Sequence, residues 1–486
     1  MEKKKQLVKL LLFVSFFLFS LEEVYGLSGT ISGKKAPLTS TYSNDNFYTY
    51  NFLTKKYEEV KCKKIWQGNK VVVYSEIDGF YTDSEFMQRI GEKVESDIIP
   101  VLETYFSDII YANLDIIFYD IHDFYKIGGQ EYYAGYFDPD YSYNNNKIFI
   151  DTNPGMIYSS IDDVLAVIAH ELQHLIHYSY DNDEEKWLNE GLSELSTYVC
   201  GFENKVHTEE FIKFPFRTLD TWNGDLNDYG KVYLFFRYLL YRKGTEIIKT
   251  IIHNTKNGIE SLFDIMGKDN FENIYHDWAC ALSVNLNQNN MIKYSITGYD
   301  FSVEPIIYFD SKKTQSIDVN LEKLSFYKFE GYTKYLQDSP INLKIADKTI
   351  KNTIFLYNNN NLTEIIELNN EETVFPKFPF NKYIVVISNG STKKREFSLT
   401  IELQGPEFKF LKNPYYIENR LIAIKGKTNN IKINNSRKSN FEKELKNNKK
   451  IISADINLTD KNTIEYSYYL TDKEYKGIII IKQGEM

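Results

Sequence analysis

Cysteine, histidine and long apolar runs are all scarce in this chain of 486 residues. Three cysteines, Cys62, Cys200 and Cys280, are too few for a disulfide framework in a chain of this length, and the sequence leaves open whether any two are paired. None of them lies in a metal-binding or nucleophile motif, which excludes a cysteine-nucleophile enzyme. After residue 26 no stretch approaches twenty continuous apolar residues, so we expect no membrane-spanning segment in the mature chain.

Basic charge is also in the minority, with 57 Lys and Arg against 67 Asp and Glu, a net charge of −10. Residues 1–26 are predicted to be an export signal, because a lysine-rich start precedes an apolar core and a small-residue exit. Losing that segment removes four lysines and three glutamates, which takes the net charge from −10 to −11. An acidic surface disfavours nucleic acid and anionic membranes as partners. From the export signal we expect a protein that is secreted or held in the cell envelope or periplasm. The sequence does not determine its oligomeric state.

Histidine is rare but concentrated: of seven histidines, His170, His174 and His177 fall within eight residues. A pair at i and i+4 on a helix projects two imidazoles from one face, close enough to bind a single zinc ion. Glu171 lies about 100° further round the helix, where its carboxylate can reach a metal-bound water without binding the metal. His177 lies about 10 Å along the axis from His170, so we interpret it as a structural or lining residue.

A second helix is expected to supply the third ligand. The motif helix has a polar start at 159–163 and an apolar face at helical spacing. The acidic run 181–185 reads as a turn, and a helical pattern restarts at 187–199, antiparallel to the first helix. Such a hairpin brings an acid beside the two histidines. Glu190 and Glu194 both qualify, one turn apart, and spacing alone does not choose between them.

Both segments together resemble a known family. Ala169-His-Glu-Leu-Gln-His174 and Trp187-Leu-Asn-Glu-Gly-Leu-Ser-Glu194 are similar to the gluzincin zinc metallopeptidases, and most closely to the hyicolysin-like family. The resemblance covers roughly residues 68–285. It implies that Glu190 binds zinc and that Glu194 hydrogen-bonds the first ligand histidine, an arrangement that fixes the imidazole tautomer. The Gly-x-Met-Glu-Asn element of the aminopeptidase relatives is absent, which favours an endopeptidase.

The activity implied by this resemblance is hydrolysis of protein or peptide substrates. One catalytic Zn²⁺ held by His170, His174 and Glu190 would leave a fourth position for water. Glu171 would act as the general base toward that water and then pass the proton to the leaving amine.

The string around Tyr229 and Tyr233 resembles the helix that delivers an oxyanion donor in this family. A tyrosine hydroxyl at that place can hydrogen-bond the developing oxyanion. The two tyrosines lie one turn apart, and we favour Tyr229. His207 and His253 are alternative donors that rank lower because they lack motif context.

The resemblance further implies an α+β, thermolysin-like gluzincin domain with a small mixed sheet and a helical half. The sequence predicts strands at 70–77, 114–119, 134–137 and 147–151, and further helices at 82–105, 229–242, 245–254, 258–266 and 271–285. In such folds an edge strand binds substrate backbone, and the small residues Ala134 and Gly135 make 134–137 the candidate. An ordinary hairpin strand explains them equally well.

From about residue 290 short alternating strands predict all-β, sandwich-like domains. The expected ranges are 1–26 for the signal peptide, 27–66 for an N-terminal extension able to lend a strand, 67–290 for the catalytic domain, 291–406 for a β-sandwich and 407–486 for a second β-rich domain. Strands are predicted at 324–329, 341–345, 354–357, 363–368, 383–388, 397–403, 421–426, 451–456 and 475–481.

A rival hypothesis makes this chain a non-catalytic surface or adhesion protein, with β binding modules and a relic or structural zinc site. The set of three ligands together with Glu171 argues against it. Calcium binding is unsupported, because the acidic clusters at Asp138–Asp140 and Asp181–Glu185 match no defined calcium loop.

Overall fold

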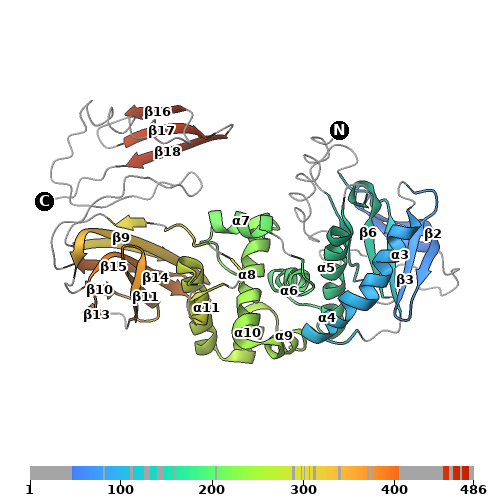
Figure 1. Cartoon of the computed structure of the whole chain (residues 1–486), viewed down its shortest axis with the longest axis horizontal. Coiled ribbons are helices and arrows are strands. Elements are labelled where there is room, and N and C mark those ends of the chain that lie inside the picture. Colours follow the sequence, from blue (N-terminus) through green and yellow to red (C-terminus); the bar gives the residue numbers. More distant parts are fainter. Residues whose placement is uncertain are drawn as a thin grey trace. The chain divides into compact units, whose positions relative to one another are not determined.

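The computed structural model forms two compact units, residues 1–215 with 219–268 and residues 216–218 with 269–486 (Figure 1). The expected export signal at 1–26 and strand at 421–426 lie outside the described residues and stay predictions. The structure describes residues 46–79, 83–109, 113–124, 132–139, 146–156, 159–202, 205–286, 291–296, 298–299, 301–305, 307–309, 314–337, 341–368, 371–374, 376–403, 453–458, 463–470 and 473–480.

The first unit is built on a mixed six-stranded sheet in the order β1-β2-β3-β4-β6-β5. The three central strands β3, β4 and β6 run parallel, and the remaining pairs are antiparallel. The strands are β1 (Asn46–Asn51), β2 (Lys56–Gln67), β3 (Val71–Glu76), β4 (Leu114–Tyr119), β5 (Gly135–Tyr136) and β6 (Lys147–Asp151). The four predicted strands are confirmed, and the expected extension lends two strands, so that the sheet begins at residue 46 and not at 67.

Alternate residues of the parallel strands divide the core into two layers. Val72, Ile117 and Phe149 belong to an aromatic-rich cluster on one face of the sheet. On the other face lie helices α3 (Ser84–Lys93) and α5 (Ile161–Tyr180). A π-helical turn (Val94–Ile98) joins α3 to α4 (Ile99–Tyr105), so the predicted helix at 82–105 is one nearly continuous helical segment.

In the helical half of this unit, α6 packs against α5 and α8, and α7 packs against α8. Helix α5 begins with a capping box in which Ser160 and Asp163 bond each other's backbone, the polar start that the sequence predicted. Gly191 on α6 allows a close approach to α8, because an added Cβ there would lie 2.4 Å from the Phe236 ring. Helix α7 was not predicted. The remaining helices are α6 (Lys186–Val199), α7 (Lys205–Lys213), α8 (Leu226–Lys243), α9 (Thr245–Ile252) and α10 (Gly258–Met266).

The second unit contains helix α11 (Lys268–Val284) and two sheets that share one hydrophobic core. One sheet has the order β13-β10-β15-β8 and the other β12-β11-β14-β9-β7, all antiparallel except β7 with β9. This is the sandwich-like arrangement that the sequence predicted. The strands are β7 (Ile307–Phe309), β8 (Thr314–Leu321), β9 (Ser325–Gln337), β10 (Ile341–Ile345), β11 (Lys351–Asn358), β12 (Asn361–Glu367), β13 (Glu371–Val374), β14 (Phe380–Asn389) and β15 (Arg395–Leu403).

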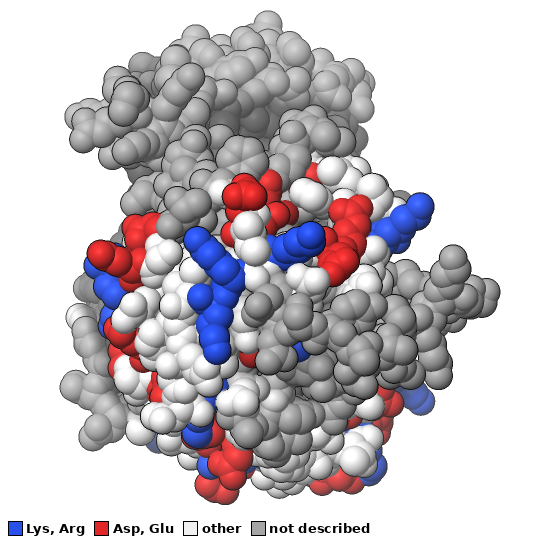
Figure 2. All heavy atoms as spheres, turned by 90° about the vertical axis from the view of Figure 1, so that its right-hand side faces the viewer, with Lys and Arg blue, Asp and Glu red and all other residues white. Residues whose placement is uncertain are grey.

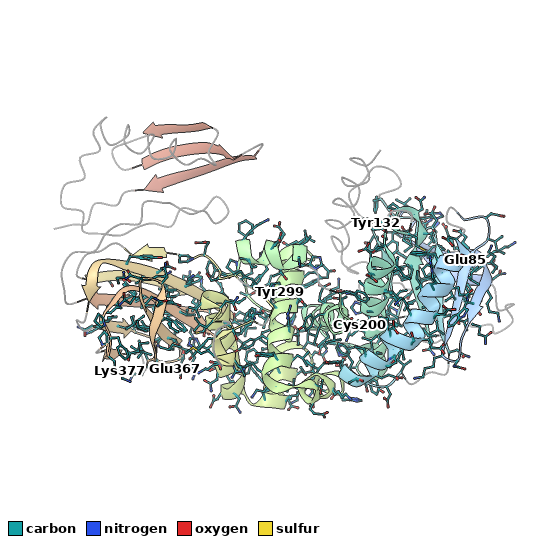
Figure 3. The ribbon with its side chains drawn as sticks, viewed as in Figure 1. Glu85, Tyr132, Cys200, Tyr299, Glu367 and Lys377 are labelled. Carbon is teal, nitrogen blue, oxygen red and sulfur yellow. The ribbon has the colours of Figure 1, made fainter. Side chains whose placement is uncertain are left out.

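Helix α11 belongs to the β-rich unit, so the expected boundary at 290 falls inside that unit. The buried ring of His276 contacts the hydroxyls of Ser388 (2.8 Å) and Thr353 (2.9 Å), which tie the helix to two strands. Glu367 on β12, labelled in Figure 3, accepts a hydrogen bond of 2.6 Å from the Tyr294 hydroxyl. A further antiparallel sheet follows, consisting of β16 (Ser453–Leu458), β17 (Thr463–Leu470) and β18 (Lys473–Ile480).

Cys62 and Cys280 are buried, and Cys200 at the end of α6, labelled in Figure 3, is half-buried. None of the three forms a disulfide bond. Among the described helices, none is long and apolar enough to cross a membrane.

Candidate metal centre

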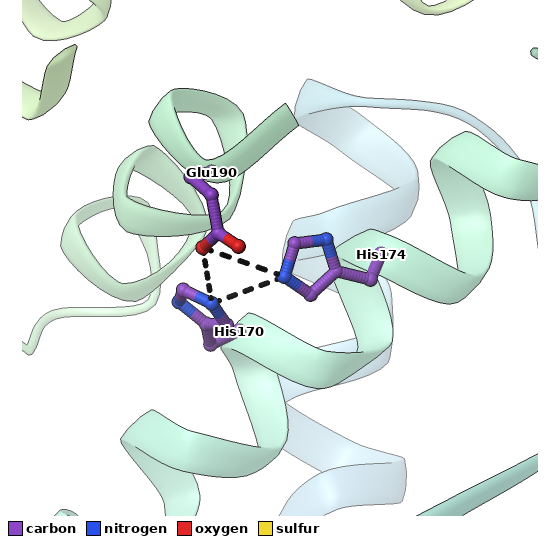
Figure 4. A group of neighbouring side chains, drawn as sticks. All are labelled: His170, His174 and Glu190. Atoms are coloured by element: carbon purple, nitrogen blue, oxygen red, sulfur yellow. Dashed lines mark hydrogen bonds and ion pairs between the residues drawn. The ribbon is translucent and has the colours of Figure 1, made fainter. Parts of the chain in front are cut away.

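Helices α5 and α6 bring three buried side chains together at one point. His170 and His174 lie one turn apart on α5, and Glu190 reaches them from α6 (Figure 4). The two Nε2 atoms are 3.1 Å apart, and Glu190 Oε2 lies 3.3 Å from the Nε2 of His170 and 3.7 Å from that of His174. All three side chains are at most 3% exposed. The hairpin predicted from the sequence therefore places two imidazoles and one carboxylate around a common centre.

These three atoms fit a bound metal ion. A tetrahedral ion with bonds of about 2.0–2.1 Å holds its ligand atoms roughly 3.3 Å apart. The observed separations bracket that value. Within the described residues, Glu190 Oε2 is buried and makes no hydrogen bond, although a buried carboxylate oxygen ordinarily has a partner. The group can thus hold a metal ion, and the chemistry of its donors, two imidazole nitrogens and one carboxylate oxygen, suits a divalent transition metal.

The charges of this group show what the metal would replace. Burial lowers the pKa of His170, but the carboxylates of Glu190 and Glu194 outweigh burial and raise that pKa to about 10. Burial acts the same way on His174, and with the charge of His170 it holds the pKa of His174 at about 4, although Glu190 opposes it. In the metal-free centre His170 is therefore positively charged and His174 is neutral. The charge on His170 lies where a bound cation would neutralise Glu190.

The far side of the His174 ring is fixed by hydrogen bonds. With Nε2 directed at the centre, the proton on Nδ1 is donated to Asn189 Oδ1 at 3.0 Å. Ser193 Oγ lies 3.1 Å from the same nitrogen and donates its own proton to Gln173. Asn189 and Ser193 belong to α6, so the helix that brings Glu190 also sets the tautomer and the plane of this ring.

Glu194, the other acid that the sequence left open, lies behind His170. Its Oε1 is 3.6 Å from Nδ1 of His170, on the side of the ring that faces away from the centre. Its Oε2 accepts a hydrogen bond of 3.0 Å from Nδ1 of His207 on α7. Burial raises the pKa of Glu194, but His207 and His170 outweigh it and hold the pKa at about 2. Glu190 thus lies at the centre and Glu194 lies behind the His170 ring, at a distance longer than the hydrogen bond that the resemblance implies.

His207 was ranked low as an oxyanion donor, and the structure gives it a different place. It holds Glu194 by the hydrogen bond above, its ring is fully buried, and it stacks on Tyr229 with ring centroids 5.2 Å apart. No local pattern signals this contact, because His207 and its partner are on different helices. His253 is exposed, lies against Tyr180 and is 3.0 Å from Ser107 Oγ, contacts outside the group of His170, His174 and Glu190.

Glu171 points from α5 toward the edge of the sheet. Burial raises the pKa of its carboxyl to about 7, and Glu190 adds to the rise, while His170 and a hydrogen bond from the backbone of Phe137 oppose it. Its Oε2 is buried and has no hydrogen-bond partner in the described part of the chain. A carboxyl group with a pKa near neutrality, beside a metal-binding group, is suited to accept and return a proton.

The two tyrosines of α8 differ in their surroundings. Tyr229 is 3% exposed, and burial raises the pKa of its phenol well above the usual range, with Glu190, Glu194 and Glu171 adding to the rise. Tyr233 instead accepts a hydrogen bond of 2.9 Å from Arg237. Tyr229 is therefore the tyrosine that the fold brings within electrostatic reach of the three acids.

The predicted substrate strand is at the edge of the sheet, as β5, antiparallel to β6. The packing of the fold itself explains the glycine at position 135. A Cβ at this position would lie 2.8 Å from Val167 Cγ1 on α5 and 2.9 Å from the carbonyl oxygen of Phe149. The packing of β5 against α5 requires a small residue at 135, whatever binds along the edge, and buried Ala134 precedes it.

Surface charge bears on the expected partners. On the face drawn in Figure 2, several Lys and Arg side chains gather in one short column, and Asp and Glu side chains lie around it. Nucleic-acid recognition ordinarily depends on a basic patch or stripe. The absence of a nucleic-acid partner stays a prediction.

Comparisons with known proteins do not identify a family. No family model matches the chain, and no curated protein matches it. Solved structures that match include periplasmic lysozyme inhibitors of g-type lysozyme from Escherichia coli (a mutant), Salmonella Typhimurium and Aeromonas hydrophila, at 7%, 9% and 9% identity. Each match covers 20% of this chain and 96–97% of the inhibitor, with a TM-score of 0.17. Likeness at that level carries no argument about the metal centre.

Proposed function

We propose that this protein is a secreted zinc-dependent endopeptidase. The observation that carries the proposal is the convergence of His170 Nε2, His174 Nε2 and Glu190 Oε2 within 3.1–3.7 Å of one another in a buried site. Two imidazoles and one carboxylate are the protein ligands of catalytic zinc in several peptidases, where the fourth position stays open. A zinc ion held here supplies a Lewis acid that polarises a carbonyl and lowers the pKa of a water molecule to about 7.

The protein's own residues perform the proton transfers. Glu171 takes the proton of the attacking water and delivers it to the leaving amine, a task that suits a carboxyl group with a pKa of about 7. Asn189 and Glu194 hold the two histidine rings in orientation from behind. Tyr229 donates a hydrogen bond to the oxyanion that forms on the scissile carbonyl. Substrate extends along β5, the edge strand next to Glu171.

The test is the pair Glu171→Gln and Glu103→Gln, assayed on casein and on a peptide library with and without a zinc chelator. Both changes replace one carboxylate by an amide, but Glu103 pairs with Lys70 away from the centre. We expect Glu171→Gln to keep its zinc and to lose at least about 100-fold in turnover, the usual contribution of a general base. Glu103→Gln should behave as the parent protein.

Two results would contradict the proposal. If Glu171→Gln keeps full activity, Glu171 is not the general base. If the parent protein keeps its activity in the presence of the chelator, hydrolysis does not depend on zinc. Stoichiometric zinc without any hydrolysis across the library would favour the rival hypothesis, a surface protein with a structural zinc site.

A further inference from the structure

A second group of metal-type ligands lies where α5 ends and α6 has not yet begun. One nitrogen of His177 and one carboxylate oxygen each of Asp181 and Glu184 lie within 4.8 Å of one another. His177 is one turn beyond His174 on α5, Asp181 caps the helix, and Glu184 stands just ahead of α6. A tetrahedral ion with bonds of about 2.0–2.2 Å holds its ligand atoms roughly 3.3–3.6 Å apart. The limit of 4.8 Å is wider than this, so the two carboxylates would have to turn toward His177 to hold an ion.

Buried polar atoms without partners point into this group. The His177 side chain is fully buried, and in the described part of the chain neither of its ring nitrogens has a hydrogen-bond partner. Asn189 approaches the ring, but its side-chain oxygen is engaged with His174. Asp181 Oδ2 and Glu184 Oε2 are likewise buried without a hydrogen bond. Three unsatisfied ligand atoms in one place are costly unless something binds them.

Contacts with α10 hold the acidic turn in position. The backbone N–H of Gly258 donates to Glu184 Oε1 at 2.6 Å, and Asn257 Nδ2 donates to the carbonyl oxygen of Asp183 at 2.6 Å. Trp187 Nε1 donates to Glu185 Oε2 at 2.7 Å. These bonds occupy one oxygen of Glu184 and leave the other for the group. The acidic side chains of this turn are therefore held in place by hydrogen bonds.

Burial shifts the pKa values of all three side chains in the direction that disfavours a charge. Burial raises the pKa of Asp181 to about 6 and that of Glu184 to about 8, and it lowers the pKa of His177 to about 3. A neutral imidazole is the form that binds a metal. The segment 181–186 contains four acids and one lysine, so its charge also favours a cation.

We infer that His177, Asp181 and Glu184 bind a second divalent transition-metal ion, of the zinc class, separate from the ion at His170, His174 and Glu190. An imidazole nitrogen with two carboxylates suits zinc and its neighbours, whereas calcium takes six to eight oxygens. The two groups share no ligand. His177 is about 4.5 Å further along the helix axis than His174, because an α-helix rises 1.5 Å per residue.

The ion would clamp the turn between the two helices that carry the first centre. Its ligands come from the end of α5 and from the residue before Glu185, the N-cap of α6. Loading the second ion would therefore fix the angle at which α6 presents Glu190 to His170 and His174. This role does not rest on peptide hydrolysis, and it holds equally if the first centre is purely structural.

The experiment counts zinc in the full-length protein after equilibration with Zn²⁺ alone. We expect about two ions per chain in the parent protein and about one in His177→Gln and in Asp181→Asn. Asp162→Asn is the matched control, because it makes the same substitution at an exposed residue in the first turn of α5, at the other end of the helix from the group. It should keep about two ions. One ion in the parent protein, or two in Asp181→Asn, would overturn the inference.

A second measurement guards against loss of folding. Asp181→Asn removes a carboxylate that burial disfavours, so without metal the variant should unfold at the parent temperature or above it. Adding Zn²⁺ should raise the unfolding temperature of the parent protein more than that of Asp181→Asn, because a ligand that binds only the folded state stabilises it. Equal shifts would overturn the inference. Peptidase activity is read separately, so that failure of the second site and failure of the proposed function give different results.

Discussion

Replacing Glu194 by Gln should weaken zinc binding without removing a ligand. The carboxylate stands behind His170, 3.6 Å from Nδ1, and is fully buried, so solvent does not screen it. Loss of an acid behind a ligand histidine typically costs about 10- to 100-fold in metal affinity. At about 1.4 kcal/mol per factor of ten, this corresponds to roughly 1.4–2.8 kcal/mol of binding free energy.

The size of this loss should depend on pH, and its sign can be worked out. His170 has a pKa of about 10 in the metal-free centre, so below that pH a proton must leave before the metal binds, and affinity rises with pH. Removing Glu194 takes away one of the three carboxylates, those of Glu190, Glu194 and Glu171, that raise this pKa. The variant therefore suffers less proton competition at neutral pH, which offsets part of its weaker bonding. The offset shrinks as the pH approaches the pKa of His170 and disappears only above about pH 10, where the proton no longer competes in either protein.

The assay is zinc affinity measured with a competing chelator between pH 6 and 9.5. The ratio of dissociation constants, variant over parent, should widen as pH rises, but at pH 9.5 it should still lie below the full 10- to 100-fold, because His170 is still largely protonated in the parent protein. Glu210→Gln is the control, an isosteric change in an acid that pairs with Lys213 near the surface of α7. A ratio of one across the whole range, in a folded variant, would refute the role given to Glu194. A ratio that narrows as pH rises would refute the proton competition.

Three further outcomes are expected. Tyr229→Phe should lower kcat by about 100- to 1,000-fold with zinc content unchanged, as loss of an oxyanion donor does, and unchanged turnover would exclude Tyr229 from that role. Tyr233→Phe should leave kcat unchanged but lower the free energy of unfolding by roughly 1–3 kcal/mol, because buried Arg237 loses a hydrogen-bond acceptor at 2.9 Å. If this variant instead lost turnover and kept its stability, Tyr233 and not Tyr229 would be the oxyanion donor. Burial lowers the pKa of His276 to about 3 in the folded protein, whereas the pKa in the unfolded chain is about 6.5. The free energy of unfolding should therefore fall as the pH drops below about 6.5, by roughly 2 kcal/mol at pH 5. Denaturant unfolding at pH 7 and pH 5 checks this: His276→Gln should lose that pH dependence while the exposed-site variant His253→Gln keeps it.

The elements that carry the metal centre could be predicted because their signals are local. Ser160 and Asp163 mark the start of α5 through a capping box, and the i, i+4 spacing of His170 and His174 fixes which face they share. The choice between Glu190 and Glu194 was out of reach of the sequence without the family resemblance. One helical turn separates the two acids, and which of them meets the Nε2 atoms depends on how α6 lies across α5.

Other features could not be predicted because their stability comes from neighbours distant in sequence. Half of the side chains of strand β2 are exposed, half are charged, and its apolar residues do not alternate. The strand is held by pairing with β1 on one side and β3 on the other. Helix α7 buries three residues, among them His207, whose partner Glu194 lies on another helix. The sequence predicts a structural role for His177, because this residue lies too far from His170 to share its metal ion. The acids beyond the end of α5 are predicted to form a turn, and nothing in the sequence shows that they lie beside His177.

The two N-terminal strands determine where a recombinant fragment can be cut. A clone that begins at residue 67 lacks β1 and β2, so the valine-rich β3 would present an unpaired hydrogen-bonding edge. It would also uncover Tyr74, whose ring has Phe47 of β1 as a neighbour 4.8 Å away. Open, apolar strand edges of this kind recruit other chains into aggregates. Expression plasmids for the metal-binding unit should therefore start upstream of Asn46, or insoluble product will be mistaken for an unstable enzyme.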